Sequence, residues 1–576
     1  MACALAHRLA HRPEGGLPSV GMSELLRQID VDAKTRLALP PNCPADQAAG
    51  LWQGFIRLET HRIRLAHRRG ASGRECCEGQ SRVWDRLLMS VTETALGAAV
   101  EGGGEAPAQD WALAMAATGG YGRRELSPAG DIGLLILGEK SVFEAQGWRR
   151  AAEWIEAPEL AGVFGRVRAL SQTIAGSVQA ANREVWTKTA LLDVRFIGGD
   201  ARLFARFQEA FLARCVEGQA EAFIAARAAD REARRVKFGR AICLQEPHIK
   251  SGCGGLRDYQ DLLWLAFVKH GCRTLSDLEA RGLVVQSERL ALEAAYDFLL
   301  RVRNETHYQS GRAADVLTKS IQPAVARGLG YAERSFSRRI ECFLRDYYRH
   351  ARLIDLSVRT IQERVGLVPS PPRRSAVPIR AAGAGSESPG YVVDGFEFVE
   401  DRVRAAAPDV FREDPCRLMR VFRHAQQRGV RLDPDMAQLV RNEVRRVGAL
   451  LRSDPGASQT FLEVLNQRGN VAPTLRAMHE TGLLGAYLPA FGRLTCLVQH
   501  EFFHQYTADE HTLVCIAKLD ELAGAREGPR AFYGDIFNRA IERPYLLYLA
   551  LLLHDAGKAR STRSEEHTSE LQSRIT

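Results

Sequence analysis

Hydrophobic and polar positions follow a helical period over most of the chain, and short apolar runs of strand type are few. Helical spacing covers residues 1–75, with a helix expected over 47–66, and returns from 201 to about 366. Short apolar runs at 111–117 and 132–137 have the character of buried strands. We therefore expect an α+β chain of several domains, with most strands in its first third.

A glycine turn separates the two expected strands. Gly119 and Gly120 carry no side chain, so the backbone there can approach phosphate groups closely. Asp131 stands where the turn leads into the second strand and can direct a carboxylate at a metal ion. Sites that bind a nucleoside triphosphate with two metal ions usually carry Asp-x-Asp on such a strand. Alternate strand residues share a face, so two carboxylates can hold two ions about 3.5–4 Å apart. Gly133 fills the second position, so the expected site is one ligand short.

Two further segments supply candidates for the same site. Residues 191–197 are expected to form a strand that contains Asp193, a candidate third carboxylate. The alternative for Asp193 is a structural salt bridge to a nearby arginine. Lys250 and Arg257 flank three glycines ahead of a helix expected over 259–269, and they could contact phosphate. The alternative there is an interdomain turn.

A second group of residues indicates a metal site near the C-terminal end. His511 lies at the start of a helix expected over 510–522, where Thr507 and Glu510 have the spacing of a capping box. His554 and Asp555 follow an apolar helix. A lone histidine is usually a core or surface residue, but His-Asp-x-Gly-Lys after such a helix is more specific. Neutral imidazoles and a carboxylate can bind a divalent ion that acidifies a water for attack on a phosphodiester.

The motif Gly-Gly-Tyr-Gly-Arg-x-Glu-Leu-x-Pro-x-x-Asp-Ile-x-Leu, which begins at Gly119, resembles the signature of a known bacterial family. The family is the bifunctional uridylyltransferase/uridylyl-removing enzyme of the nitrogen-regulatory protein PII. The segment Pro-x-Ile-Lys-x-Gly-x-Gly-Gly-Leu-Arg-Asp, which begins at Pro247, resembles it as well.

This resemblance implies two reactions. In a polymerase-β-type nucleotidyltransferase domain, a tyrosine of PII would attack the α-phosphate of UTP bound with Mg²⁺. In an HD domain, a metal-activated hydroxide would release UMP from PII-UMP, with Mg²⁺ or Mn²⁺ as the metal. The resemblance also implies glutamine as the family's effector, and we expect the domains that sense it to be absent from this sequence. The roles that follow are catalysis by Asp131 and Asp193, nucleotide binding by Gly119, Gly120, Arg123, Lys250 and Arg257, and metal binding by Asp131, His511, His554 and Asp555.

The expected organisation follows from these motifs and from a Pro/Gly/Ser-rich linker. It comprises an N-terminal helical segment (1–75), the nucleotidyltransferase domain (76–200), a helical uridylyltransferase-associated domain (201–368), the linker (369–390), a helical connecting region (391–490), an incomplete all-α HD domain (491–560) and a tail (561–576). Residues 563–573 match the translation of a sequencing adapter, so we expect the tail to be artefactual. The competing interpretation is that His567 and Glu570 are native.

The composition argues against a nucleic-acid partner and a membrane partner. The net charge of +9 invites a nucleic-acid partner, but aromatic residues are sparse and are not interleaved with the basic runs. The sequence has no C-x-x-C pair and no apolar run of the ~20 residues that span a bilayer, so we expect a cytoplasmic location without a membrane partner.

Two alternative functions remain open. One is a catalytically inactive protein that binds nucleotide or PII. Gly133 favours it, and so does the expected absence of the further carboxylate that an HD site takes from a later helix. The other is an RNA nucleotidyltransferase with an HD domain, against which the long helical block argues. Glutamine-synthetase adenylyltransferase shares the nucleotidyltransferase fold but carries no HD site.

Overall fold

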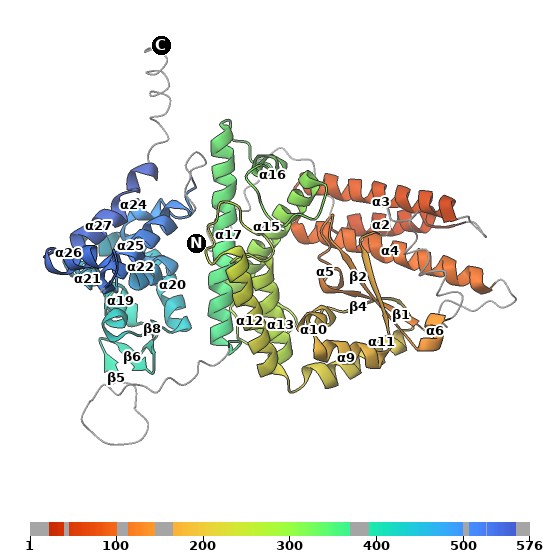
Figure 1. Cartoon of the computed structure of the whole chain (residues 1–576), viewed down its shortest axis with the longest axis horizontal. Helices are drawn as coiled ribbons and strands as arrows, with labels where there is room; N and C mark the ends of the chain where they lie inside the picture. The colour runs from red at the N-terminus through yellow and green to blue at the C-terminus, as the bar shows by residue number, and fades with distance from the viewer. Residues whose placement is uncertain are drawn as a thin grey trace, which may run out of the picture.

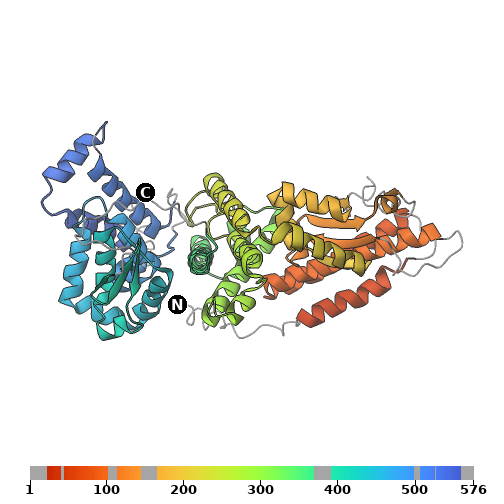
Figure 2. The same ribbon diagram turned by 90° about the horizontal axis from the view of Figure 1, so that it is seen from below.

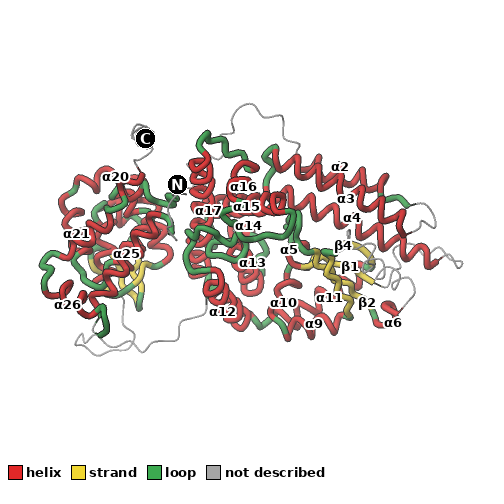
Figure 3. Tube along the Cα trace, turned by 45° about the horizontal axis from the view of Figure 1, so that its top comes forward, coloured by secondary structure: helices red, strands yellow, loops and turns green. Residues whose placement is uncertain are grey.

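The computed structural model describes residues 22–39, 45–100, 113–144, 165–368, 391–498, 506–525 and 527–559. Helices dominate these residues, and the strands form two separate four-stranded sheets (Figure 3). The expected linker (369–390) and tail (561–576) lie outside the described residues. Within the part of the chain that is described, no helix has both the length and the apolar character needed to cross a bilayer.

The first sheet has the strand order β3-β2-β1-β4, in which β2 and β3 run parallel and the other neighbours antiparallel. Its strands are β1 (Leu113–Thr118), β2 (Ile132–Gly138), β3 (Val167–Gln172) and β4 (Arg195–Gly199). The apolar run expected over 132–137 is therefore a strand. Of the run expected over 111–117, residues 113–117 form a strand, and residues 111 and 112 lie outside the described ranges.

Helices cover both faces of this sheet. The helices that precede and surround it are α2 (Met22–Arg36), α3 (Ala45–Arg68), α4 (Gly73–Val100), α5 (Gly119–Gly122), α6 (Lys140–Glu144), α9 (Ile174–Arg183), α10 (Val185–Leu192) and α11 (Ala201–Phe211), with a π-helical turn η3 (Leu212–Val216). Strand residues alternate between two cores: Ile132 and Leu134 pack with α2 to α4, whereas Leu135 and Leu137 pack with α9 and α11. Figure 2 shows the red and the yellow helices on opposite sides of the sheet.

A helical block, α12 to α17, follows the sheet and contacts the N-terminal end of α4. Its elements are α12 (Ala220–Phe238), α13 (Leu256–His270), α14 (Leu275–Ala280), α15 (Gln286–Ser310), α16 (Gln322–Gly328) and α17 (Phe336–Arg364). The Asp297 carboxylate of α15 accepts hydrogen bonds from the first amides of α4, at Gly73 (3.1 Å) and Arg74 (2.9 Å). The boundary expected between residues 75 and 76 thus falls inside a helix that serves both the N-terminal helices and the sheet.

The C-terminal part contains the second sheet, β5-β6-β7-β8, which the sequence did not predict within 391–490. Its strands are β5 (Tyr391–Val393), β6 (Phe396–Val399), β7 (Arg402–Ala405) and β8 (Arg431–Leu432). The helices are α18 (Val410–Glu413), α19 (Arg417–Arg428), α20 (Pro434–Ser453), α21 (Pro455–Leu465), α22 (Ala472–Glu480), α23 (Leu483–Tyr487), α24 (Pro489–Gly492), α25 (Ala508–Gly524), α26 (Ala531–Arg539) and α27 (Pro544–Leu553), followed by the 3₁₀ turn η4 (Ala556–Ala559).

Helix α17 separates the N-terminal two-thirds from the C-terminal part (Figure 1). Ion pairs join the two across this helix, including Arg359 with Glu480 (3.1 Å) and Glu363 with Arg402 (3.0 Å). One face of α17 is buried against α13 and α15, and the C-terminal part lies on its other side. The helix is therefore a structural element shared by both parts.

The α9/α11 core supports the sheet that carries the glycine turn, and Phe207 is at its centre with 0% exposure. We predict that Phe207→Ala lowers the free energy of local opening of the sheet by about 3–5 kcal/mol, because it removes a buried ring and leaves a cavity. Hydrogen exchange of the β1 and β2 amides measures this change. Phe532→Ala, at a position that is 67% exposed, is the control and should leave that exchange unchanged. Equal effects of the two variants would contradict the assignment of this core.

Candidate functional sites

The glycines of the turn are required for two different reasons, backbone conformation and close packing. Gly119 adopts a φ of +56°, in the left-handed region that favours glycine, and Gly120 follows it in α5. Gly122 is glycine for a different reason, since a Cβ there would lie 2.1 Å from the carbonyl oxygen of Asp193. The turn therefore packs closely on the segment that precedes β4.

Gly133 lies opposite Thr118 in the β1–β2 register, on the same face of β2 as Leu135. A Cβ at Gly133 would come 2.5 Å from the Thr118 hydroxyl oxygen, so the threonine occupies the space that an aspartate would need. Asp131 precedes the strand with its carboxylate 72% exposed, and its ion pair with Arg168 is long, at 3.7 Å. The predicted metal ligand is thus exposed and lacks the expected companion two residues on.

Asp193 is not on a strand, which corrects the expectation for 191–197. Helix α10 ends at Leu192, Asp193 caps it, and β4 starts at Arg195. Strand β1 lies between β2 and β4, so Asp131 and Asp193 do not belong to neighbouring strands. The apolar residues 191 and 192 belong to a buried helix end, which periodicity over so short a run cannot distinguish from a strand.

The Asp193 carboxylate is held by two donors. Arg123 Nη1 donates to Oδ2 (2.5 Å), Trp264 Nε1 of α13 donates to Oδ1 (2.8 Å), and the side chain is only 7% exposed. Burial alone would lower the pKa of Arg123, but the carboxylates of Asp193 and Glu125 raise it above its usual value. Burial raises the pKa of Asp193, and the Arg123 charge and the Trp264 hydrogen bond oppose that rise. The salt bridge that the sequence left as an alternative is present.

Lys250 and Arg257 form the positive part of the site. Within the described residues, neither side chain has a hydrogen-bond or ion-pair partner, and the Arg257 guanidinium lies over the Trp186 and Trp264 rings at 5.6 and 5.1 Å. Burial, followed by the charge of Arg303, lowers the pKa of Lys250 to about 8. Burial, followed by the charge of Arg123, lowers the pKa of Arg257 to about 10. A bound anion would offset the repulsion between these neighbouring positive charges, as phosphate does at basic nests.

These donors do not fit a two-ion magnesium site. Asp131 offers one exposed carboxylate, Gly133 offers none, and the Asp193 oxygens already accept bonds from Arg123 and Trp264. Among the described residues, the cluster of three or more potential metal ligands is elsewhere, at His511, His554 and Asp555.

The second site is built by α25 and by the end of α27. His511 lies in the first turn of α25, and His554 and Asp555 follow the last residue of α27. The two helices pack together, and Tyr548 of α27 donates a hydrogen bond to Asp520 of α25 (2.5 Å). One ligand atom from each of the three residues lies within 4.8 Å of the others, which confirms the predicted convergence.

The capping box expected at the start of α25 is absent. Thr507 is the N-cap residue, but its hydroxyl donates to Asp509 Oδ1 (2.6 Å) instead of accepting from the helix. Glu510 pairs with Arg476 of α22 (2.9 Å). Thr507 is therefore used in a local contact with Asp509 and Glu510 in a tertiary contact with α22, and the spacing of the two residues indicates neither contact.

The three side chains are oriented in a way that suits a cation. His554 Nδ1–H donates to the carbonyl oxygen of Leu551 (2.6 Å), so Nε2, which lies 3.4 Å from Asp555 Oδ1, carries the ring's lone pair. Asp555 is 5% exposed, and its Oδ2 is buried without a hydrogen-bond partner. Lys558 pairs with the other oxygen, Oδ1, at 2.8 Å. A buried carboxylate together with two imidazoles is a donor set that fits a divalent ion.

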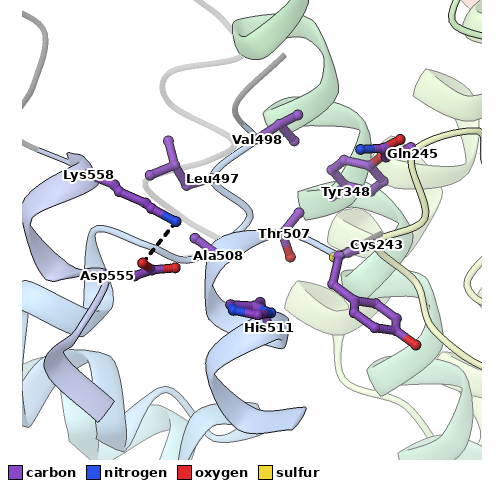
Figure 4. A pocket seen from close by; sticks show the side chains of 11 residues that line it. Cys243, Gln245, Tyr348, Leu497, Val498, Thr507, Ala508, His511, Asp555 and Lys558 are labelled. Carbon is purple, nitrogen blue, oxygen red and sulfur yellow. Dashed lines mark ion pairs between the residues drawn. The ribbon is translucent and has the colours of Figure 1, made fainter. Parts of the chain in front are cut away.

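A cavity of about 30 Å³ adjoins this cluster, large enough for water at the ligand atoms. His511, Asp555 and Lys558 line one side of it, and Cys243 and Tyr348 of the helical block line the other (Figure 4). The centre therefore lies at the junction of the helical block and the C-terminal part. Sequence reasoning missed Lys558 as a partner of Asp555 and missed this second wall, because neither spacing nor composition places α17 beside α25.

Comparisons with known proteins agree with the resemblance. Residues 222–361 match the model of the family described as GlnD PII-uridylyltransferase, and residues 396–487 match that of the uridylyltransferase GlnD third domain. A bifunctional uridylyltransferase/uridylyl-removing enzyme of Rhodopseudomonas palustris is 30% identical over 511 residues, which cover 87% of this chain and 53% of the relative. The enzyme of the same name in Nitrobacter winogradskyi is 31% identical over 530 residues, covering 89% and 55%.

The chain belongs to this family. It spans about half the length of the curated relatives it matches. Both matched ranges of the family models lie between the glycine turn and the histidine cluster, and the first of them contains Lys250 and Arg257.

The two aspartates of the first site should respond differently to amidation. Asp193→Asn removes the charge partner of a buried arginine, and we expect it to destabilise the sheet by about 3 kcal/mol. Asp131→Asn changes an exposed carboxylate and should stay within about 0.5 kcal/mol. Hydrogen exchange of β4 and α13 measures both. If Asp193→Asn kept full stability but lost Mg²⁺-nucleotide affinity, Asp193 would regain the catalytic role that the sequence suggested.

Proposed function

We propose that this chain carries a metal-dependent phosphodiesterase centre of the uridylyl-removing type, acting on PII-UMP, and a uridylyltransferase module weakened by Gly133. The observation that supports the first activity is the convergence of His511, His554 and Asp555, with one buried carboxylate oxygen left unpartnered. The matching family is that of GlnD PII-uridylyltransferase, which supports PII as the substrate.

In the proposed centre, His511, His554 and Asp555 hold the cation, and each has its own structural support. A divalent ion bound there would supply a water of lowered pKa and balance the charge of the phosphodiester. Leu551 fixes the tautomer of His554 through its carbonyl oxygen. Lys558 holds Asp555 through Oδ1, the oxygen that lies 3.4 Å from His554 Nε2, and Oδ2 keeps no hydrogen-bond partner. Hydrolysis would release UMP and return the tyrosine hydroxyl of PII. Mn²⁺ suits the two imidazoles better than Mg²⁺ does, since Mg²⁺ prefers oxygen ligands.

The nucleotidyltransferase module supports a nucleotide-binding role. Gly119 and Gly120 open the turn, and Lys250 and Arg257 provide cationic groups for a triphosphate. The described donors do not hold two magnesium ions, so binding of UTP with weak or no transfer is the second candidate function for this half. Control of either activity by glutamine stays a prediction from the family.

Removal of the metal ligands tests the hydrolase proposal. We expect His511→Ala and Asp555→Ala to weaken Mn²⁺ binding at least about 100-fold, because changes in a ligand's support alone cost 10–100-fold. His61→Ala, an exposed histidine on α3, is the control. Calorimetry with Mn²⁺ and release of labelled UMP from uridylylated PII measure the two effects. Unchanged Mn²⁺ binding in both ligand variants would show that the cation binds elsewhere.

Restoration of the missing carboxylate tests the transferase proposal. A lost electrostatic element typically costs ~10²–10³ in rate, so we expect very weak uridylylation by the native chain. The sequence predicts recovery in Gly133→Asp, but the Thr118 hydroxyl would lie 2.5 Å from the new Cβ. We therefore expect the larger gain from Gly133→Asp combined with Thr118→Ala, with Thr118→Ala alone as the control.

Transfer from labelled UTP to PII measures this gain, and tRNA serves as the competing acceptor. Efficient labelling of PII by the native chain would show that the magnesium site has been misplaced. Preferential labelling of tRNA would favour the RNA nucleotidyltransferase alternative.

A further inference from the structure

A buried set of polar groups connects α17 of the helical block to the helix that carries His511. Arg352, on α17, donates to His479 at two atoms, through Nη1 to the ring Nε2 (2.5 Å) and through Nη2 to the carbonyl oxygen (2.7 Å). Its Nη1 also lies 3.7 Å from Oδ2 of Asp509 on α25. The three side chains are between 3% and 17% exposed.

Asp509 carries a charge that this connection balances. A guanidinium can only donate, so the Nε2 of His479 accepts from Arg352 and cannot at the same time donate to Asp509, although it lies 3.2 Å from Oδ2. The cationic partner of the Asp509 carboxylate in the described structure is then Arg352. A charge buried to this degree requires such a partner.

Asp509 in turn fixes the start of α25. Its Oδ2 accepts from the backbone amide of Cys496 (3.1 Å), and its Oδ1 accepts from the hydroxyl of Thr507, the N-cap residue (2.6 Å). His511 is two residues further on, in the same turn, and its amide donates to the Thr507 carbonyl (2.8 Å). The position of the His511 ring therefore depends on how Asp509 is held.

The same face of α17 approaches the metal centre directly. Tyr348, one helical turn before Arg352, lines the cavity opposite His511 (Figure 4). Its hydroxyl donates to the carbonyl oxygen of Leu244 (2.5 Å), which holds the ring against the loop that carries Cys243. Helix α17 thus supplies both a wall of the cavity and the cation beneath the first turn of α25.

We propose that Arg352 is a positioning residue for the metal centre, acting from the helical block on His511 through Asp509. This rests on the proposed function, since it takes His511 as a ligand of the cation. It predicts that the helical domain contributes to metal affinity in the C-terminal part without touching the metal.

The full chain and Mn²⁺ alone provide the test. We expect Arg352→Ala to weaken Mn²⁺ binding about 10-fold, the lower end of the effect of an outer partner, and to speed hydrogen exchange in the first turn of α25. Arg352→Lys keeps the charge beside Asp509 and should recover most of the affinity. Arg352→Gln removes the charge but keeps a polar amide of intermediate length, should behave like the alanine variant, and replaces it if the alanine variant does not fold.

Arg359→Ala is the matched control. Arg359 is on the same helix and pairs with Glu480, the residue after His479, at 3.1 Å, so it contributes to docking of the C-terminal part without contacting Asp509. We expect its Mn²⁺ affinity to equal that of the native chain. Equal losses in the Arg359 and Arg352 variants would overturn the proposal, because both effects would then come from docking alone. Native affinity in Arg352→Ala and Arg352→Gln would overturn it as well.

His511→Ala separates this inference from the proposed function. A large loss of Mn²⁺ binding in His511→Ala, with no loss in the Arg352 variants, overturns only the positioning role. Native Mn²⁺ binding in His511→Ala overturns the metal centre itself, and the positioning role with it.

Discussion

The buried ion pair between Arg123 and Asp193 is the interaction on which the N-terminal half depends. Asp193 leads into β4, Arg123 follows the glycine turn, and the Trp264 indole of α13 donates to the same carboxylate. Glu125 extends the connection, because it accepts from Arg123 (2.7 Å) and from the Tyr296 hydroxyl of α15 (2.7 Å). The sheet is thereby joined to the helical block by charged groups that must stay paired once they are buried.

This arrangement also decides what the first site can hold. The Asp193 carboxylate already accepts bonds from Arg123 and Trp264, and burial and neighbouring positive charges lower the pKa values of Lys250 and Arg257. At the second site the balance is reversed, since Asp555 keeps one oxygen without a partner beside two imidazoles. The first site is therefore suited to an anion, and the second to a cation.

Local sequence reasoning succeeded where one element determined the result. The strand at 132–137 and the turn at Gly119 follow from short motifs with their own conformational requirements. The convergence of His511 with His554 and Asp555 was predicted from two motifs, and the packing of α25 on α27 produces it. It failed where a distant element decided. Asp193 ends a helix under the influence of Arg123 and Trp264, Glu510 turns to Arg476, and the strands between 391 and 432 are too short to show alternation. The catalytic roles of Asp131 and Asp193 remain predictions.

The placement of α17 has a consequence for how two activities can share one chain. Its buried face packs with α13, which carries Arg257 and the Trp264 that binds Asp193, and Tyr348 and Arg352 contact the surroundings of the metal centre. Packed helices shift as rigid units because close-packed cores resist continuous deformation. A change in the anion site that moved α13 would therefore have α17 as a physical route to α25. Coupling of this kind needs two arrangements of α17 with different affinities at the two sites, since without that difference in free energy a shared helix transmits nothing.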